Sequence, residues 1–221
     1  MRSGTLHASD ADPQVVPAAR SMFRALVGEG QWQALPRAVQ LRFDGELAPG
    51  EEVVYVGEVA CTQRTRIGRL WALLLRFAGS PLPLESLHHT ASTVVVTGTR
   101  TGAQCWTRTY ESPGRRSQVI RSMKCFSGPT GLEERVGAGL SMALTVSVES
   151  RALVFRSVGY HWKVGAWTLS IPMWLTPGAI TVRHREERSG RFSFTLSVVH
   201  PLFGCLIHQV AYFRDAHGCA P

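Results

Sequence analysis

From about residue 90 to residue 215 the chain reads as one β-strand after another, with no helix-length segment between them. Runs in which polar and apolar residues alternate are separated by short stretches rich in Gly, Pro or Ser. Strands in series leave unpaired edges unless the sheet closes on itself or is covered. The pattern therefore predicts a mainly β (α+β) fold, either an antiparallel β-barrel or a strongly curved meander sheet.

The individual strands can be placed from the alternation and from the turn residues between them. The expected strands cover residues 53–62, 90–100, 104–111, 118–126, 140–149, 153–163, 179–187, 191–200 and 205–214. Gly159 suggests a β-bulge, and residues 171–177 are expected to form a loop or a short helix. In the fifth strand we expect these side chains to face inward: Leu140, Met142, Leu144, Val146 and Val148.

Two segments before this series are helical in character. Residues 17–39 carry an apolar stripe that glycines interrupt, and residues 67–78 form an amphipathic helix with arginines off its apolar face. The stripe of the second helix contains Ile67, Leu70, Trp71 and Leu74, and Gly79 is expected to end it. Such a helix either lies on a membrane surface or covers a sheet, and we favour packing against the barrel mouth or open face.

Length and composition predict one β-rich domain over residues 17–215. A chain of 221 residues that is 44% hydrophobic can build one large core. Residues 1–16 are polar and read as a disordered lead, and residues 216–221 as a short tail. The chain has no apolar signal-peptide core and no run of about 18 apolar residues, so we expect a cytoplasmic protein without a transmembrane segment.

The cysteines fit the same compartment. They are five in number, lack a CxxC motif, and mostly lie in apolar or strand-like runs, so we expect buried free thiols. The net charge of +8 raises the question of nucleic-acid binding. Only Lys124 and Lys163 are lysines, and the arginines are scattered through the strands rather than clustered, which disfavours that function.

Arginines and one carboxylate on apolar strand faces are the candidate ligand-binding residues. Glu58 shares a strand face with Val54 and Val56, and Arg108 shares one with Trp106 and Tyr110. If these faces point inward, the charged groups meet inside the barrel and form a polar anchor for an anionic ligand within an apolar wall. The predicted ligand-binding residues are Glu58, Trp106, Arg108, Tyr110, Arg121, Arg156 and Tyr160. The alternative is that these side chains reach the rim or that the faces are reversed.

No residue pattern predicts a catalytic or metal site. His88 and His89 are adjacent and would point to opposite faces of a strand, and the other histidines are scattered. Glu133 and Glu134 could serve a general acid role, but a solvated charge run is the better interpretation. We therefore predict no metal, no cofactor and no assigned catalytic residue.

Several short motifs carry a family resemblance. They are ERVG at residues 134–137, IPMWLTP at 171–177, GRFSF at 190–194, HPLFG at 200–204 and WTRTY at 106–110. With the order of the elements, they make the chain from about Phe23 to Phe213 similar to a bacterial family, domain of unknown function 4166. Members of that family stand alone or follow an NAD(P)-binding module resembling saccharopine dehydrogenase. This chain has no GxGxxG after a strand, and Thr195 stands where relatives tend to have an acidic residue.

The resemblance implies no activity, so the functional hypotheses rest on the barrel. The first is a module that binds a small hydrophobic or amphipathic molecule inside the barrel, as an accessory to an NAD(P)-dependent oxidoreductase. The second is a cofactor-free enzyme of the cyclase or isomerase type, which would use interior Arg, Glu or Tyr side chains. The third is an interaction domain for an oxidoreductase partner. A deep pocket that holds Glu58 or Arg108 with perturbed titration would favour the second hypothesis, and an apolar cavity without convergent polar groups would favour the first. A filled interior with an exposed apolar patch would favour the third.

Overall fold

The computed structural model describes residues 21–77, 82, 87–111, 114, 117–188 and 190–216. The expected N-terminal lead, the tail beyond residue 216 and the expected helix stop at Gly79 lie outside these residues.

Short helices precede and interrupt a long series of strands. The helices are α1 (Met22–Val27), α2 (Glu29–Gln33), α3 (Arg37–Asp44) and α4 (Arg66–Phe77), with a 3-10 turn, η1 (Met173–Leu175). The strands are β1 (Glu52–Arg64), β2 (His88–Gly98), β3 (Gln104–Tyr110), β4 (Gln118–Cys125), β5 (Glu133–Gly137), β6 (Leu140–Glu149), β7 (Ala152–Val164), β8 (Trp167–Ile171), β9 (Ala179–Glu186), β10 (Phe192–His200) and β11 (Gly204–Asp215).

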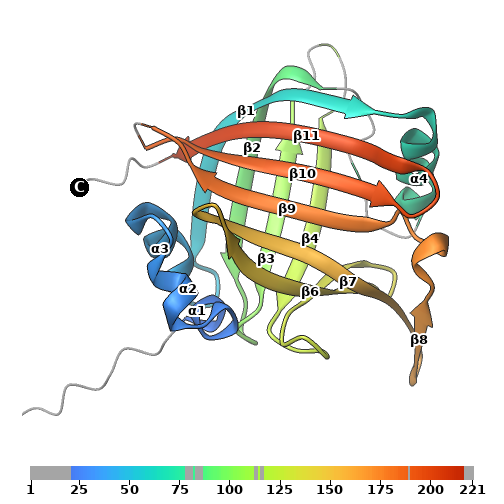
Figure 1. The fold of residues 1–221 in the computed structure, drawn as a ribbon, viewed down its shortest axis with the longest axis horizontal. Helices are drawn as coiled ribbons and strands as arrows, with labels where there is room; N and C mark the ends of the chain where they lie inside the picture. The colour runs from blue at the N-terminus through green and yellow to red at the C-terminus, as the bar shows by residue number, and fades with distance from the viewer. Residues whose placement is uncertain are drawn as a thin grey trace, which may run out of the picture.

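The strands close into an antiparallel barrel, as the sequence predicts. In the part of the chain that the structure describes, the ring of ten strands runs β6-β5-β4-β3-β2-β1-β11-β10-β9-β7, and pairing of β6 with β7 closes it. Strand β7 branches, because its first half pairs with β9 and its second half pairs with β8. Figure 1 shows β8 extending from one end of the barrel, outside the ring.

Two strands were not expected from the sequence. Strand β5 has only five residues and begins with two glutamates, so its period-two pattern is too short to stand out. Strand β8 is exposed almost throughout and shows no buried face. The expected irregularity near Gly159 is confirmed, because the register of β6 and β7 shifts where Ala143 and Leu144 face Gly159 and Ser157.

The inward faces of β3 and β6 are the predicted ones. Trp106 and Tyr110 of β3 and Met142 and Leu144 of β6 are buried in the main core. Strand β1 is reversed relative to the expectation: Tyr55 and Val59 are buried, whereas Val54, Val56 and Glu58 lie on the outer face. Both faces of β1 carry β-branched residues, so alternation alone could not decide which one points inward.

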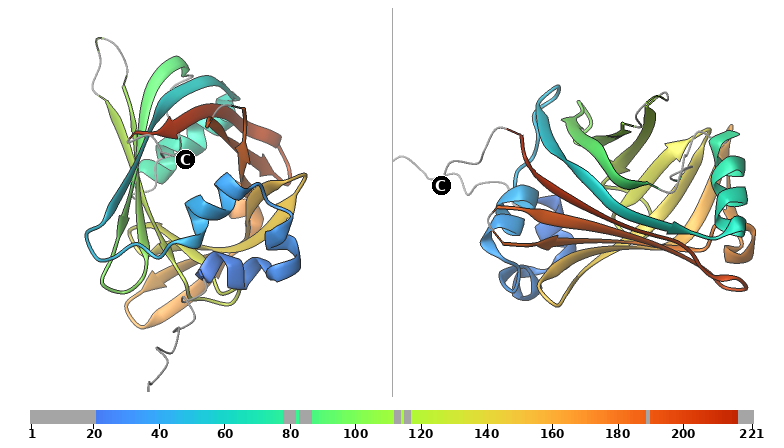
Figure 2. Two further views of the ribbon diagram at one scale, coloured as in Figure 1. Left: turned by 90° about the vertical axis from the view of Figure 1, so that its left-hand side faces the viewer. Right: turned by 90° about the horizontal axis from the view of Figure 1, so that it is seen from above.

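The three N-terminal helices close one end of the barrel (Figures 1 and 2). They insert Phe23, Trp32, Val39 and Phe43 into the core, each at most 4% exposed. The Phe23 ring meets the Phe43 ring edge-on at 5.5 Å between centroids. Gly28 lies between α1 and α2 with a φ of +82°, a backbone conformation that suits glycine at this break.

A buried histidine lies beneath these helices. His184 of β9 is fully buried, and its Nε2 lies 3.0 Å from Nη1 of Arg42 on α3, which donates to it. Arg42 also forms ion pairs with Glu186 at 3.0 Å and Asp215 at 3.6 Å. Burial, and secondly the charge of Arg42, holds the pKa of His184 well below its usual 6.5. The imidazole is therefore neutral in the folded protein.

Helix α4 lies at the opposite end and packs through small residues. Ala72 is fully buried against β11, and a Cβ atom at Gly68 would come within 2.5 Å of the Leu206 carbonyl oxygen. Of the apolar stripe expected to cover the barrel, Trp71 packs on it together with Leu75, whereas Ile67, Leu70 and Leu74 are exposed. The helix thus packs on the barrel as predicted, but through a face that shares only part of the expected stripe.

Candidate functional site

A cavity of about 130 Å³ lies inside the barrel. Apolar side chains from nine strands make most of its wall, and a few charged groups interrupt them on one side. The lining residues are Leu82, Val94, Trp106, Arg108, Tyr110, Ile120, Arg121, Ser122, Lys124, Glu134, Val136, Met142, Leu144, Phe155, Ile180, Val182, Phe194, Leu196, Gln209, Ala211 and Phe213. An apolar cavity with convergent polar groups is the usual form of a small-molecule site.

Three charged side chains and one hydroxyl come from three adjacent strands. Arg108 is on β3, the Ser122 hydroxyl and Lys124 are on β4, and Glu134 is on β5. Lys124 and Glu134 are direct partners in the β4–β5 register, and residues two apart on one strand share a face. The β4–β5 pairing thus places the Lys124 ammonium group beside the Glu134 carboxylate. Arg108 of the neighbouring strand β3 lines the same cavity.

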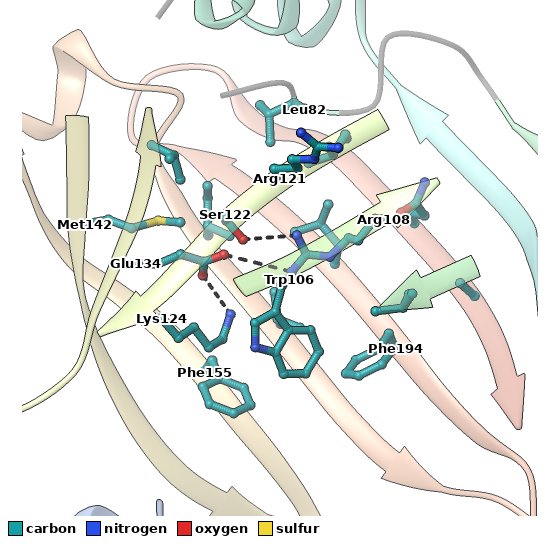
Figure 3. Close-up of a pocket in the computed structure, with 18 of the residues that line it drawn as sticks. Leu82, Trp106, Arg108, Arg121, Ser122, Lys124, Glu134, Met142, Phe155 and Phe194 are labelled. Atoms are coloured by element: carbon teal, nitrogen blue, oxygen red, sulfur yellow. Dashed lines mark hydrogen bonds and ion pairs between the residues drawn. The ribbon is translucent and has the colours of Figure 1, made fainter. Parts of the chain in front are cut away.

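The four side chains form one network (Figure 3). Lys124 donates from Nζ to Glu134 Oε2 at 3.0 Å, and the side chains of both residues are less than 10% exposed. Arg108 Nη2 lies 3.9 Å from Glu134 Oε1, and its Nη1 donates to Ser122 Oγ at 3.3 Å. Within this network two cations therefore share one carboxylate.

The ionisation of the network follows from this geometry. Burial by itself would raise the pKa of Glu134, but Lys124, Arg108 and hydrogen bonds from Ser122 and Lys124 bring it down to about 2. Burial lowers the pKa of Lys124, and repulsion by Arg108 acts in the same direction, while Glu134 opposes both.

Aromatic rings surround the cations. The Lys124 Nζ atom lies 4.9 Å from the centroid of the Trp106 ring and 5.6 Å from that of Phe155. The Arg108 guanidinium carbon lies 5.8 Å from the Trp106 centroid. These rings stabilise positive charge in a site that excludes much of the water.

Four of the seven predicted ligand-binding residues line the cavity. Trp106, Arg108 and Tyr110 do so along β3, and burial, countered by Arg108, raises the pKa of the Tyr110 hydroxyl. Arg121 is exposed and contributes at the edge of the cavity, beside Leu82 (Figure 3).

The other three lie elsewhere. Tyr160 is buried, and its hydroxyl donates to the Gly178 carbonyl oxygen at 2.7 Å. Glu58 lies on the outer face with its carboxylate 3.9 Å from His89, and Arg156 is exposed with an ion pair to Glu149 at 3.0 Å. The faces of β1 and β7 that carry these charges are the outer ones, so the expectation that they meet inside the barrel is wrong.

Sequence reasoning missed the centre of the site. In the sequence Lys124 stands out only as one of two lysines, and Glu134 reads as part of a solvated charge run. A local signal exists for each. Lys124 shares a strand face with Ser122 and Ile120, and Glu134 shares one with Val136. Recognising them as partners requires the β4–β5 register, which no local pattern contains.

The comparisons with known proteins agree with the resemblance. The model of the family described as Domain of unknown function (DUF4166) matches residues 35–213. The chain belongs to this family. No curated protein and no solved structure matches it. The DUF4166 region covers all eleven strands except the last two residues of β11, and it contains every charged residue of the cavity. Among the described residues no helix is long and apolar enough to cross a membrane.

Proposed function

We propose that this DUF4166 protein binds a small amphipathic anion inside its barrel, with the apolar part against the cavity wall and the anionic group at Arg108 and Lys124. The observation that carries the proposal is the charge of the buried network. Among the residues that the structure describes, Arg108 and Lys124 face a single carboxylate, that of Glu134, in a cavity whose other lining residues are mostly apolar.

The excess positive charge of Arg108 and Lys124 over Glu134 is unfavourable inside a mostly apolar cavity. Removing an ion from water costs several kcal/mol unless a counter-ion and hydrogen bonds compensate it. A carboxylate or phosphate from a ligand would supply that counter-charge and accept hydrogen bonds from the Arg108 guanidinium. It would also oppose the burial and repulsion that lower the pKa of Lys124.

The size of the cavity limits the ligand. At about 130 Å³ it is close to the roughly 150 Å³ of an apolar cavity that holds benzene. A monocyclic aromatic acid or a short branched carboxylic acid matches this volume. The aromatic side chains Trp106, Phe155 and Phe194 suit a flat apolar group.

The network favours binding over proton transfer. A carboxylate with a pKa of about 2 is a weak base at neutral pH, and a general base works best with a pKa near the working pH. The cofactor-free enzyme is therefore the second choice. The accessory role beside an NAD(P)-dependent oxidoreductase rests on the family resemblance, and the cytoplasmic location rests on the cysteines, of which the described ones are free.

The test compares benzoate with benzamide. Native mass spectrometry and isothermal titration calorimetry on the purified chain should show binding of the acid and weaker binding of the neutral amide. Arg108→Met should weaken benzoate binding about 10-fold or more, because a hydrogen bond to a charged group contributes about 1.5–3 kcal/mol. Arg135→Met, an exposed arginine on the outer face of β5, is the matched control and should bind as the parent does.

Either of two affinity results would refute the proposal: equal affinity of the parent for benzoate and benzamide, or equal affinity of the parent and Arg108→Met for benzoate. It would also be refuted if neither probe bound and native mass spectrometry, after gentle purification from several hosts, showed only the mass of the chain with no co-purified molecule.

A further inference from the structure

Large apolar side chains gather at the end of the barrel opposite the N-terminal helices. This end, called the apolar end here, consists of α4, the β7–β8 hairpin, η1 and the β10–β11 turn. Figures 1 and 2 show α4 and β8 at this end and α1–α3 at the other. Trp167 is 76% exposed and Leu202 is 71% exposed. Such side chains are unusual in contact with water when they occur together.

The outward face of α4 is the first part of the apolar end. Ile67, Leu70 and Leu74 follow one another at helical spacing, and all three are exposed. The opposite face, with Gly68 and Ala72, already packs on β11. The helix therefore turns these three large apolar side chains away from its own barrel, while Trp71 and Leu75 pack on the core beneath it.

The β7–β8 hairpin is amphipathic in the same way. Trp162 pairs with Leu169 and Val164 pairs with Trp167, so four exposed apolar side chains share one face of the two-stranded ribbon. The other face carries polar side chains: His161, Lys163, Thr168 and Ser170. Strand β6 begins at Leu140, which pairs with Trp162, so the hairpin continues past the first residue of that strand.

Direct contacts join these parts into one surface. The His200 ring at the end of β10 stacks between Trp71 of α4, at 6.2 Å, and Phe203 of the β10–β11 turn, at 4.7 Å. His200 Nε2 also lies 3.2 Å from the Trp174 carbonyl oxygen of η1, which follows β8. The apolar end is thus continuous from the helix through the turn to the hairpin.

The charges of the apolar end have one sign. Arg66, Arg69 and Arg76 border the exposed stripe of α4, and Lys163 lies on the polar face of the hairpin. The sequence contains no Asp or Glu in residues 66–77, 158–175 or 199–208, which form the described part of this surface. Protruding Trp, Phe and Leu side chains bordered by basic residues are the composition of an interface with anionic lipid.

We propose that the apolar end docks on the surface of an anionic phospholipid bilayer, with α4 and the β7–β8 hairpin inserted at headgroup depth. Charge complementarity selects lipid over a protein partner: the described residues of the surface include basic side chains and no carboxylate, and two tryptophans at protruding positions suit the bilayer interface. The inference does not depend on the proposed ligand. The two sites nevertheless adjoin, because Leu82, Ile180 and Leu196 line the cavity and pack in the small core beneath α4.

The test is co-sedimentation of the full chain with vesicles of phosphatidylcholine alone and of phosphatidylcholine with phosphatidylglycerol at three to one. Binding to the anionic vesicles should be at least 10-fold tighter and should weaken as salt is raised. The double variant Trp167→Ser/Leu202→Ser should lose binding, and its exposed positions leave the core intact. Leu41→Ser, an exposed leucine on α3 at the other end, is the control and should bind normally. Arg69→Gln should reduce binding about five-fold.

Failure to bind anionic vesicles would overturn the inference, and so would equal binding by the double variant. A dimer in sedimentation equilibrium that the double variant dissociates, without vesicle binding, would assign the surface to a second copy of the chain. Arg108→Met should dock normally, so loss of benzoate binding and loss of vesicle binding are separate results.

Discussion

The buried pair of Lys124 and Glu134 gives the sharpest test of the interior network. Replacing Lys124 by Met removes the ammonium group and leaves the Glu134 carboxylate in the cavity wall with Arg108 3.9 Å away. The double variant Lys124→Met/Glu134→Leu removes both charges and fills the space with apolar groups. Comparing the variants measures how much the contribution of Lys124 to stability depends on Glu134, and the reverse.

The magnitude follows from the distance. At 3.0 Å and an effective dielectric constant of about 20, the attraction is about 5.5 kcal/mol, and desolvation of the two ions offsets much of it. Removing one partner of a buried pair costs about 3–5 kcal/mol. Because Arg108 still faces the carboxylate, Lys124→Met should cost about 3 kcal/mol, whereas the double variant should cost no more than about 1 kcal/mol.

The cycle has four members: the parent, Lys124→Met, Glu134→Leu and the double variant. Urea denaturation monitored by tryptophan fluorescence measures the free energy of unfolding of each. The same cycle on Arg135 and Glu133 is the control, because their side chains lie 2.9 Å apart on the same strand but Arg135 is exposed. That coupling should be below about 1 kcal/mol. Equal coupling for the two pairs, or a double variant as unstable as Lys124→Met, would refute the reasoning.

Three further predictions concern stability. Tyr160→Phe should lower the free energy of unfolding by about 1–2 kcal/mol, because it leaves the buried Gly178 carbonyl without its donor; an unchanged urea midpoint would contradict this. Gly57→Ala should destabilise the protein by about 3 kcal/mol or more, since the new methyl group would collide with the Tyr212 carbonyl, and a parental melting temperature would disprove it. Stability should fall as the pH drops below about 6.5, because the unfolded chain then binds a proton at His184 that the folded protein, with its depressed pKa, does not. The slope should reach at most about 1.4 kcal/mol per pH unit. In urea titrations His184→Leu should remove this dependence between pH 6.5 and 5, and a variant that keeps the slope would show that another group causes it.

Local patterns in the sequence are enough to predict the architecture. Alternation between Leu140 and Glu149, and along Trp106, Arg108 and Tyr110, identified strands and their inward faces correctly. The absence of helical segments after residue 90 was enough to predict a closed or curved antiparallel sheet. These are local signals, because the period of two follows from the geometry of a single strand.

Where the charges meet depends on contacts between segments that are distant in the sequence. Both faces of β1 carry β-branched residues, so its own pattern does not show which face is inward. The inward face depends on pairing with β2 and β11, and Glu58 lies on the outer one. Lys124 and Glu134 meet because β4 and β5 pair in one register. Helix α4 exposes Ile67, Leu70 and Leu74 because Gly68 and Ala72 allow the closer approach to β11 on another face. Periodicity is a property of one segment, whereas register and the choice of packing face are set by contacts between segments far apart in the chain.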